Sequence, residues 1–274
     1  MRAGTLLWGC VLFFSLILVS CSKNPPPPQQ ITSATFSLSP FSDEELVWQN
    51  ATLAVPVRGT VGSMITTNDQ GLAMWRLAGV KPKTRWPVIV MIAGCETPIS
   101  TILMRALAEQ GFIALSLESS ARRQQPIACD RAADIPTRAA QIISSKTAEL
   151  SYALGALQNM PWADQGNIFL LGDNEAGAAV ALASGRPSKA RILVNWNCEG
   201  TDTTRGLRDE AISPIFVVTS ATLRPRPAGT CASYMQAGGE SQNLTLPDTY
   251  SQDALMEPIV FTQLLHFLDQ QLFK

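Results

Sequence analysis

Histidine is almost absent from this chain, which has one histidine among 274 residues. Charge is also scarce, because 16% of the residues are Asp, Glu, Lys or Arg and the formal net charge is −1. A near-neutral chain lacks the basic surface that holds phosphate backbones, so no nucleic-acid partner is expected. No internal repeat is visible, and a hydrophobic content of 46% suits one globular domain with a core of ordinary size.

Residues 1–20 have the pattern of a signal peptide. Arg2 supplies a short positive segment, and TLLWGCVLFFSLILVS follows as an uninterrupted apolar run. This run is long for a signal peptide and slightly short for a membrane-spanning helix, so length leaves both open. The residues Leu18-Val19-Ser20-Cys21 resemble the bacterial lipobox, whose cysteine is diacylated and becomes the new N-terminus. We therefore predict acylation, for example by palmitate, at Cys21; an uncleaved signal anchor remains the alternative.

The segment 21–32 is predicted to be a linker between this anchor and a single domain at 33–274. It contains four consecutive prolines, which favour an extended polyproline II conformation and would hold the domain away from the bilayer. More than one acyl chain makes membrane attachment stable. By resemblance to lipoprotein sorting, Ser22 predicts delivery to the periplasmic face of the outer membrane. The inner membrane is left open.

Strand-like and helical segments alternate along the rest of the chain. Two N-terminal segments, TLAVPVRGTV and GLAMWRLAG, are predicted to form an antiparallel pair at the sheet edge. The alternation that follows predicts an α/β fold with a mostly parallel sheet and right-handed crossovers. The expected strands are 87–94, 112–118, 168–172, 191–198 and 214–222, and the expected helices are 99–110, 137–159, 175–185 and 258–273.

The stretch IFLLGDNEAGAA (168–179) predicts a strand–turn–helix elbow, the turn on which hydrolases mount a nucleophilic serine as G-x-S-x-G. The central position is Asn174. The apex of such an elbow takes a strained, positive-φ conformation and needs small residues two positions away on each side, here Gly172 and Ala176. Asparagine tolerates this backbone geometry. Its carboxamide, however, is no comparable nucleophile, because the nitrogen lone pair is delocalised.

Over most of residues 50–274 the chain resembles the α/β-hydrolase superfamily, and within it the dienelactone hydrolase-like family. The segments that carry the resemblance are IAGC (92–95), RALAEQGFIALSLES (105–119), LLGDNEAGAAVALA (170–183) and PIFVVTSA (214–221). The resemblance implies a mostly parallel central sheet with helices on both faces and an antiparallel N-terminal edge. It also implies an oxyanion hole made by the amide of Glu175 and an amide from the loop after IAGC.

The triad that the resemblance implies is not matched by these residues. The family places its histidine in the loop after the last strand, but NLTLPDTYSQDAL (243–255) contains none. The single histidine, His266, shares a polar stripe of the final helix with Gln263 and Gln270, so we expect it at the surface. No aspartate follows PIFVVTSA closely, although Asp248 or Asp253 could approach from the later loop. No catalytic residue is therefore predicted.

Two other groups of residues could supply a nucleophile. Ser144-Ser145-Lys146 suggests a Ser–Lys pair, but adjacent residues on a helix point about 100° apart, so a polar surface patch is expected. Cys95 lies at the mouth of the cleft and could be a nucleophile if free. A disulfide is the favoured interpretation of this cysteine, because no histidine is near it in the predicted fold.

Four cysteines remain outside the N-terminal segment, and all are expected at the carboxyl edge of the sheet. An even number in an exported chain implies two disulfides, with three connectivities open. Pairing by neighbourhood favours Cys95–Cys129 and Cys198–Cys231, each closing a loop of about thirty residues and worth roughly 3–4 kcal/mol. Their spacings match no zinc pattern, and we expect neither a metal nor a cofactor.

The sequence thus predicts a lipid-anchored envelope protein with a binding or scaffolding role. Asp173, Asn174 and Glu175 are the candidate contact residues in the cleft. An envelope protein is the expected partner, and a small-molecule ligand, such as an ester or lactone that the cleft carries, is an alternative. The other alternative is a dienelactone hydrolase-like esterase or lactonase with non-standard or weak residual activity.

Overall fold

A computed structural model of the chain describes most of residues 41–274. The described residues are 41–57, 60–67, 85–95, 98–123, 135–184, 188–196, 198, 206–207, 213–220, 231, 235, 240–247 and 254–274. The lipobox, the linker, Cys129 and the predicted strand GLAMWRLAG lie outside these residues. Predictions that depend on them are not tested by the structure.

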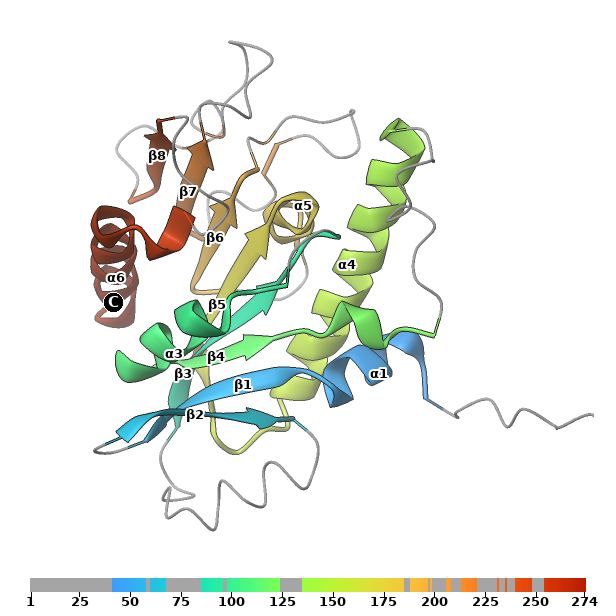
Figure 1. The fold of residues 1–274 in the computed structure, drawn as a ribbon, viewed down its shortest axis with the longest axis horizontal. Helices are drawn as coiled ribbons and strands as arrows, with labels where there is room; N and C mark the ends of the chain where they lie inside the picture. The colour runs from blue at the N-terminus through green and yellow to red at the C-terminus, as the bar shows by residue number, and fades with distance from the viewer. Residues whose placement is uncertain are drawn as a thin grey trace, which may run out of the picture. The chain divides into compact units, whose positions relative to one another are not determined.

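An eight-stranded sheet runs through the described part of the chain in the order β2-β1-β4-β3-β5-β6-β7-β8 (Figure 1). Only β1 is antiparallel to its neighbours, and every other neighbouring pair is parallel. This confirms the predicted α/β class with an antiparallel N-terminal edge. The strands are β1 (Thr52–Val57), β2 (Thr60–Thr66), β3 (Trp86–Ile92), β4 (Ile113–Ser116), β5 (Ala163–Asp173), β6 (Ala190–Val194), β7 (Ile215–Ser220) and β8 (Gln242–Leu246).

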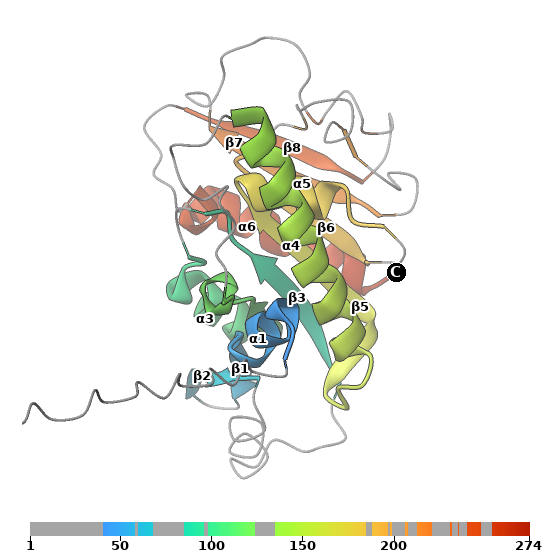
Figure 2. The ribbon, with the colours of Figure 1, turned by 90° about the vertical axis from the view of Figure 1, so that its right-hand side faces the viewer.

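Helices cover both faces of the sheet (Figures 1 and 2). On one face, α1 (Asp43–Gln49), α4 (Ile135–Leu157) and α5 (Glu175–Ala181) share a core with the sheet. On the other face, α3 (Thr101–Glu109) and α6 (Pro258–Leu272) bury a second core. None of the helices in the described residues is long and apolar enough to cross a membrane.

The central strands are buried on both faces, which explains their continuous apolar sequence. In β3, Val88 and Val90 pack into the first core, and Ile89 and Met91 pack into the second. All four side chains have no exposed area. Because successive side chains of a strand point to opposite faces, only an apolar run can fill both cores at once.

Three elements differ from the sequence prediction. The described partner of β1 at the edge is β2, which pairs Thr60 with Val57. The segment TLAVPVRGTV therefore contains all of β1 and the start of β2. Helix α1 was not predicted; it begins at a Ser42 cap whose Oγ accepts a hydrogen bond of 3.1 Å from the amide of Glu45. Strand β8 occupies part of NLTLPDTYSQDAL, where we expected a loop. This edge strand alternates polar and apolar residues and is only partly buried, so its sequence signal is weak.

Candidate functional site

The predicted elbow connects the end of β5 to the start of α5, with Asn174 at its apex. The φ and ψ angles of Asn174 are 53° and −125°, a region that residues with a Cβ atom rarely adopt. Two backbone hydrogen bonds of 2.9 Å hold this conformation: the Asn174 amide donates to the Val194 carbonyl, and the Gly177 amide donates to the Asn174 carbonyl. The backbone therefore has the strained geometry that the sequence predicts.

Three glycines allow the elbow to form. A Cβ atom on Gly172 would overlap the carbonyl oxygen of Ala176 and lie 2.8 Å from the Cα of Gly177. A Cβ atom on Gly177 would lie 2.6 Å from the Cβ of Trp196. A Cβ atom on Gly94 would lie 2.5 Å from the Glu175 carboxylate and 3.1 Å from the Cβ of Asn174. The loop after β3 is thus packed directly against the elbow.

Two asparagine amides hold the carboxylate of Asp173 beside the apex. Asn174 Nδ2 donates to Asp173 Oδ2 over 3.2 Å, and Asn195 Nδ2 donates to Asp173 Oδ1 over the same distance. Asn195 follows the end of β6 and also has a positive φ, of 54°. Sequence reasoning missed Asn195; its signal was an asparagine directly after a buried strand, a residue type that tolerates left-handed backbone.

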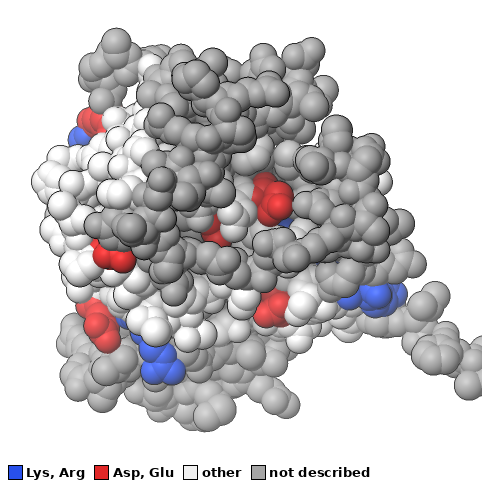
Figure 3. Space-filling model, turned by 45° about the horizontal axis from the view of Figure 1, so that its top comes forward, with Lys and Arg blue, Asp and Glu red and all other residues white. Residues whose placement is uncertain are grey.

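A cavity of about 420 Å³ opens beside this carboxylate. Among the described residues of its lining, Asp173 is the one ionisable residue. The other described residues are mainly aliphatic and come from the start of α3, the ends of β5 and β6, and the short helix η5 (Ala254–Met256). Of the three predicted contact residues, Asp173 lines the cavity, whereas the Glu175 carboxylate lies against Gly94. In Figure 3 the described acidic and basic atoms of this face form separate spots rather than a patch of one sign.

The histidine lies where the sequence predicts. His266 is exposed on α6, and its Nε2 lies 2.8 Å from Nε2 of Gln270, the next residue of the polar stripe. The chain has no other histidine. Among the described residues, no group of His, Cys, Asp or Glu side chains could hold a metal ion.

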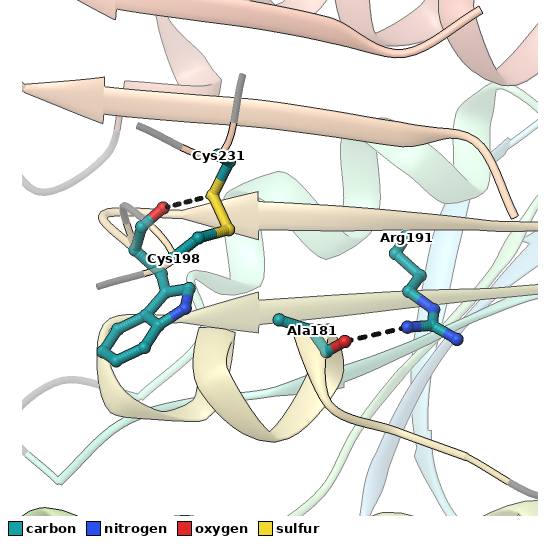
Figure 4. The surroundings of a disulfide bond; sticks show 5 residues. Ala181, Arg191, Cys198 and Cys231 are labelled. Carbon is teal, nitrogen blue, oxygen red and sulfur yellow. Dashed lines mark hydrogen bonds between the residues drawn. A yellow bond between two sulfur atoms is a disulfide. The ribbon is translucent and has the colours of Figure 1, made fainter. Parts of the chain in front are cut away.

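The predicted disulfide Cys198–Cys231 is present (Figure 4). It follows β6, and the Sγ atom of Cys231 lies 3.6 Å from the carbonyl oxygen of Trp196, the residue that packs on Gly177. Cys95 is also disulfide-bonded, which confirms the favoured interpretation of this cysteine and excludes the alternative of a free nucleophile. Its expected partner, Cys129, lies outside the described residues.

A buried arginine caps the short helix α5. Arg191 of β6 has 2% exposure, and it donates to the carbonyls of Ala181 over 2.9 Å and Ala183 over 3.0 Å (Figure 4). A cation at a helix C-terminus satisfies carbonyls that have no partner within the helix and interacts favourably with the helix dipole. The arginine explains why α5 ends at Ala181 rather than near residue 185 as predicted.

The prediction that Ser144-Ser145-Lys146 forms a polar surface patch is wrong for Lys146, whose exposure is 3%. Ser144 is exposed, but Lys146 and Glu149 lie one turn apart on the inner face of α4. Lys146 Nζ contacts Ser119, which begins the short helix η1 (Ser119–Ala121) just beyond β4. A single lysine among the polar residues of an amphipathic helix gives no sequence signal that it is buried.

The comparisons with known proteins support the fold. No protein-family model and no curated protein sequence matches the chain. A cold-adapted esterase from an Arctic intertidal metagenomic library, in complex with PEG, is 13% identical, with a TM-score of 0.51 over 81% of this chain and 94% of the esterase. A candidate dienelactone hydrolase from Klebsiella pneumoniae is 13% identical, with a TM-score of 0.47 over 80% of this chain and 98% of that chain.

A further match is a candidate dipeptidyl aminopeptidase IV from Bacteroides ovatus, with 11% identity and a TM-score of 0.45. The match covers 70% of this chain, which spans 32% of the length of that peptidase. Identities this low indicate a shared fold and nothing finer. The likeness to the Arctic esterase and the topology of the sheet together establish an α/β-hydrolase-like fold.

Proposed function

We propose that this chain is a lipid-anchored envelope protein whose α/β-hydrolase-like domain binds a ligand or a protein partner at the elbow without hydrolysing it there. One observation carries the proposal. The elbow has the geometry that elsewhere presents a nucleophile, but its apex is Asn174, whose amide donates to Asp173. An amide committed to that hydrogen bond orients a carboxylate and attacks nothing.

The missing base supports the same conclusion. An elbow nucleophile needs a neighbour that removes its proton, and histidine does this in the hydrolases with this turn. The chain's one histidine is exposed on α6 and contacts Gln270. Replacing Asn174 by serine would therefore supply the hydroxyl without the histidine that activates it.

The cavity supports a small ligand. Its volume of about 420 Å³ and its aliphatic lining suit a compact molecule with an apolar body. The carboxylate of Asp173 accepts hydrogen bonds, so a hydroxyl or amine group on the ligand would bind there. Small esters, lactones and their hydroxylated relatives are the compounds to test first.

Turnover and binding can be measured on the same protein. The full chain with oxidised cysteines would be assayed against short-chain esters and lactones, next to Asn174→Ala and Asn174→Ser. We expect no turnover that depends on residue 174 in any of the three proteins. Turnover that falls in Asn174→Ala would contradict the proposal.

Binding can be followed as a rise in melting temperature with ligand concentration, because a ligand that binds the folded state stabilises it. Ile102→Trp would fill the mouth of the cavity, since Ile102 lines it and is 66% exposed. We expect this variant to lose the shift. Ile259→Trp is the matched control, because Ile259 is 65% exposed on α6 and is not part of the lining. A shift that persists in Ile102→Trp would exclude this cavity as the site.

The anchor requires a separate test. Cells that express the full chain would be labelled with a palmitate analogue and fractionated. We expect the label on wild type and on Cys10→Ser, and its loss in Cys21→Ser together with release from the membrane fraction. Label that persists in Cys21→Ser would refute acylation at Cys21. Recovery of wild type with the inner membrane would refute the outer-membrane location. Capture through the anchored wild type, compared with Cys21→Ser, would then identify an envelope partner.

A hydrolase with non-standard chemistry is the second candidate function. The contact between Ser119 and the buried Lys146 favours it, because it places a serine hydroxyl against an amine that has been removed from water.

A further inference from the structure

A serine, a lysine and a glutamate meet beyond the carboxyl end of β4. Ser119 begins η1, three residues after β4 ends at Ser116, and it is partly exposed. Lys146 and Glu149 come from α4 and have 3% and 1% exposure. The serine is therefore partly exposed, while the lysine and the glutamate behind it are buried.

The three groups form one hydrogen-bonded chain. Lys146 Nζ donates to Ser119 Oγ over 2.5 Å, and Ser119 Oγ donates to Glu149 Oε2 over 2.6 Å. Lys146 Nζ lies 3.7 Å from the same carboxylate oxygen. The other oxygen, Oε1, accepts from Arg122 over 2.9 Å, and Ser145 Oγ lies 3.4 Å from it. This is the arrangement that nucleophilic catalysis needs: a hydroxyl within reach of a base that a third group orients.

Burial of Lys146 favours its neutral form. Arg122, which follows η1, and Lys146 share the single carboxylate of Glu149, and both side chains are largely buried. Arginine does not lose its proton in proteins, so loss of the Lys146 proton leaves a neutral Arg122–Glu149 pair in place of a buried net charge. Burial lowers the pKa of Lys146 from 10.5, and Arg122 lowers it further, whereas Glu149 and Glu175 oppose this shift.

The outer carboxylates act on Arg122 rather than on the lysine. Asp43 and Glu44 of α1 lie 3.7 Å and 3.6 Å from the Arg122 guanidinium, and both are partly exposed. They pair with the arginine at the rim of the cluster. In the described part of the chain, the groups that face the Lys146 amine are Ser119, Glu149, Arg122 and, from the start of α5, Glu175.

We propose that Ser119 is a nucleophile activated by Lys146, and that the pair cleaves small carboxylic esters at a site separate from the elbow. Loss of a proton from Lys146 Nζ leaves a lone pair directed at Ser119 Oγ. The serine hydroxyl then turns away from Glu149 and donates its hydrogen bond to Nζ. The Oγ atom then attacks the ester carbonyl while its proton moves to Nζ. Collapse of the tetrahedral intermediate breaks the bond to the alcohol, which takes the proton back from Nζ.

The acyl group remains on Ser119 until water replaces it. Lys146 removes one proton from that water, and the hydroxide adds to the acyl carbon. Release of the acid returns the proton to Oγ, so the cycle needs no oxidant, reductant or further reactant. Serine–lysine pairs are a known variant of the triad, and they need no histidine. The assignment does not depend on the proposed binding role, because the nucleophile Ser119, the base Lys146 and the orienting carboxylate of Glu149 all lie outside the elbow.

The test is covalent labelling of the folded full chain with a fluorophosphonate, an electrophile that reacts with activated serines, followed by mass spectrometry of the peptides. We expect an adduct on Ser119 and its loss in Ser119→Ala. In Lys146→Met, which removes the amine at similar volume, we expect a labelling rate lower by about 100-fold or more. The wild-type rate should rise with pH through the pKa of Lys146 and then level off, and Lys146→Met should lose this step.

Three variants complete the design. Ser120→Ala is the matched control, because Ser120 is the exposed neighbour whose Oγ donates to Glu118 instead; it should label as wild type does. Lys146→Arg keeps a cation but cannot accept the proton, so it should also lose labelling and serves if Lys146→Met fails to fold. Asn174→Ala examines the elbow, because a loss of labelling in this variant would assign the chemistry to the elbow.

Two results would overturn the proposal. The first is no adduct on Ser119 in folded wild type anywhere between about pH 6 and about pH 10, a range that spans the titration of a lysine with a lowered pKa. The second is an adduct that forms on Ser119 with the same rate and pH profile in folded Lys146→Met or Lys146→Arg. Hydrolysis of p-nitrophenyl acetate that is lost in Ser119→Ala and kept in Ser120→Ala would place turnover at this pair.

Discussion

Replacing Gly172 by alanine should destabilise the domain, although the change would ordinarily do the opposite. Gly172 lies in β5 with an ordinary φ, and there alanine reduces the entropy of the unfolded chain and stabilises by about 0.4–1 kcal/mol. At this position the new Cβ would overlap the Ala176 carbonyl oxygen and lie 2.8 Å from the Cα of Gly177. Both are backbone atoms, so α5 must move. Overpacking of this kind costs about 1–3 kcal/mol, and we expect a net loss near the upper end.

Urea unfolding of the full chain, followed by tryptophan fluorescence, measures the effect. Gly166→Ala is the matched control in the same strand, because its Cβ would have one ordinary contact, 3.6 Å from the Asp164 carboxylate. We expect the free energy of unfolding to fall for Gly172→Ala and to stay within about 0.5 kcal/mol of wild type for Gly166→Ala. An unchanged or raised stability of Gly172→Ala would refute the close approach of α5 to β5 at the elbow.

Three further changes test the surroundings of the site. Arg191→Met should lower the free energy of unfolding by about 2–4 kcal/mol, because the α5 carbonyls that it caps remain buried; a midpoint equal to wild type in urea would disprove the cap. The double variant Cys198→Ser, Cys231→Ser should lower the free energy of unfolding by about 3–4 kcal/mol, because the disulfide joins residues 33 positions apart and restricts the unfolded chain. An unchanged thermal midpoint would contradict this expectation. The third is Lys146→Met, measured against pH. Because the pKa of Lys146 is lowered in the folded state, the unfolded state holds the proton more tightly. The free energy of unfolding of wild type, relative to that of Lys146→Met, should therefore rise with pH between the lowered pKa and pH 10.5. A difference that does not change with pH would contradict the shift.

Much of the fold could be predicted from the sequence, because the central strands leave few alternatives. A strand such as β3, buried on both faces, must be apolar at every position, and that pattern is visible without an alignment. The elbow was predictable for a similar reason, since glycine and alanine at fixed positions around one apex meet a steric demand. Strand β8 gave a weaker pattern because one of its faces is exposed.

The polar parts of the site were harder to predict because they depend on contacts between distant segments. Asn195 reaches Asp173 across 22 positions, and Ser119 reaches Lys146 across 27. Neither spacing has a local signature. The sequence suggests only the adjacent Ser144 and Ser145 as partners of Lys146. Helical periodicity describes a single helix and contains no information about the segments that pack against it.

The strained apex can be reconciled with the binding role that we propose. A backbone like that of Asn174 costs about 1–3 kcal/mol and persists only where its surroundings enforce it. Glycine would relieve that strain, but it would also remove the amide that, together with Asn195, holds the Asp173 carboxylate beside the cavity. An asparagine at the apex therefore has a use that neither glycine nor serine could serve in the same way. Under this proposal, the turn that would otherwise aim a nucleophile at a substrate orients a carboxylate toward a ligand.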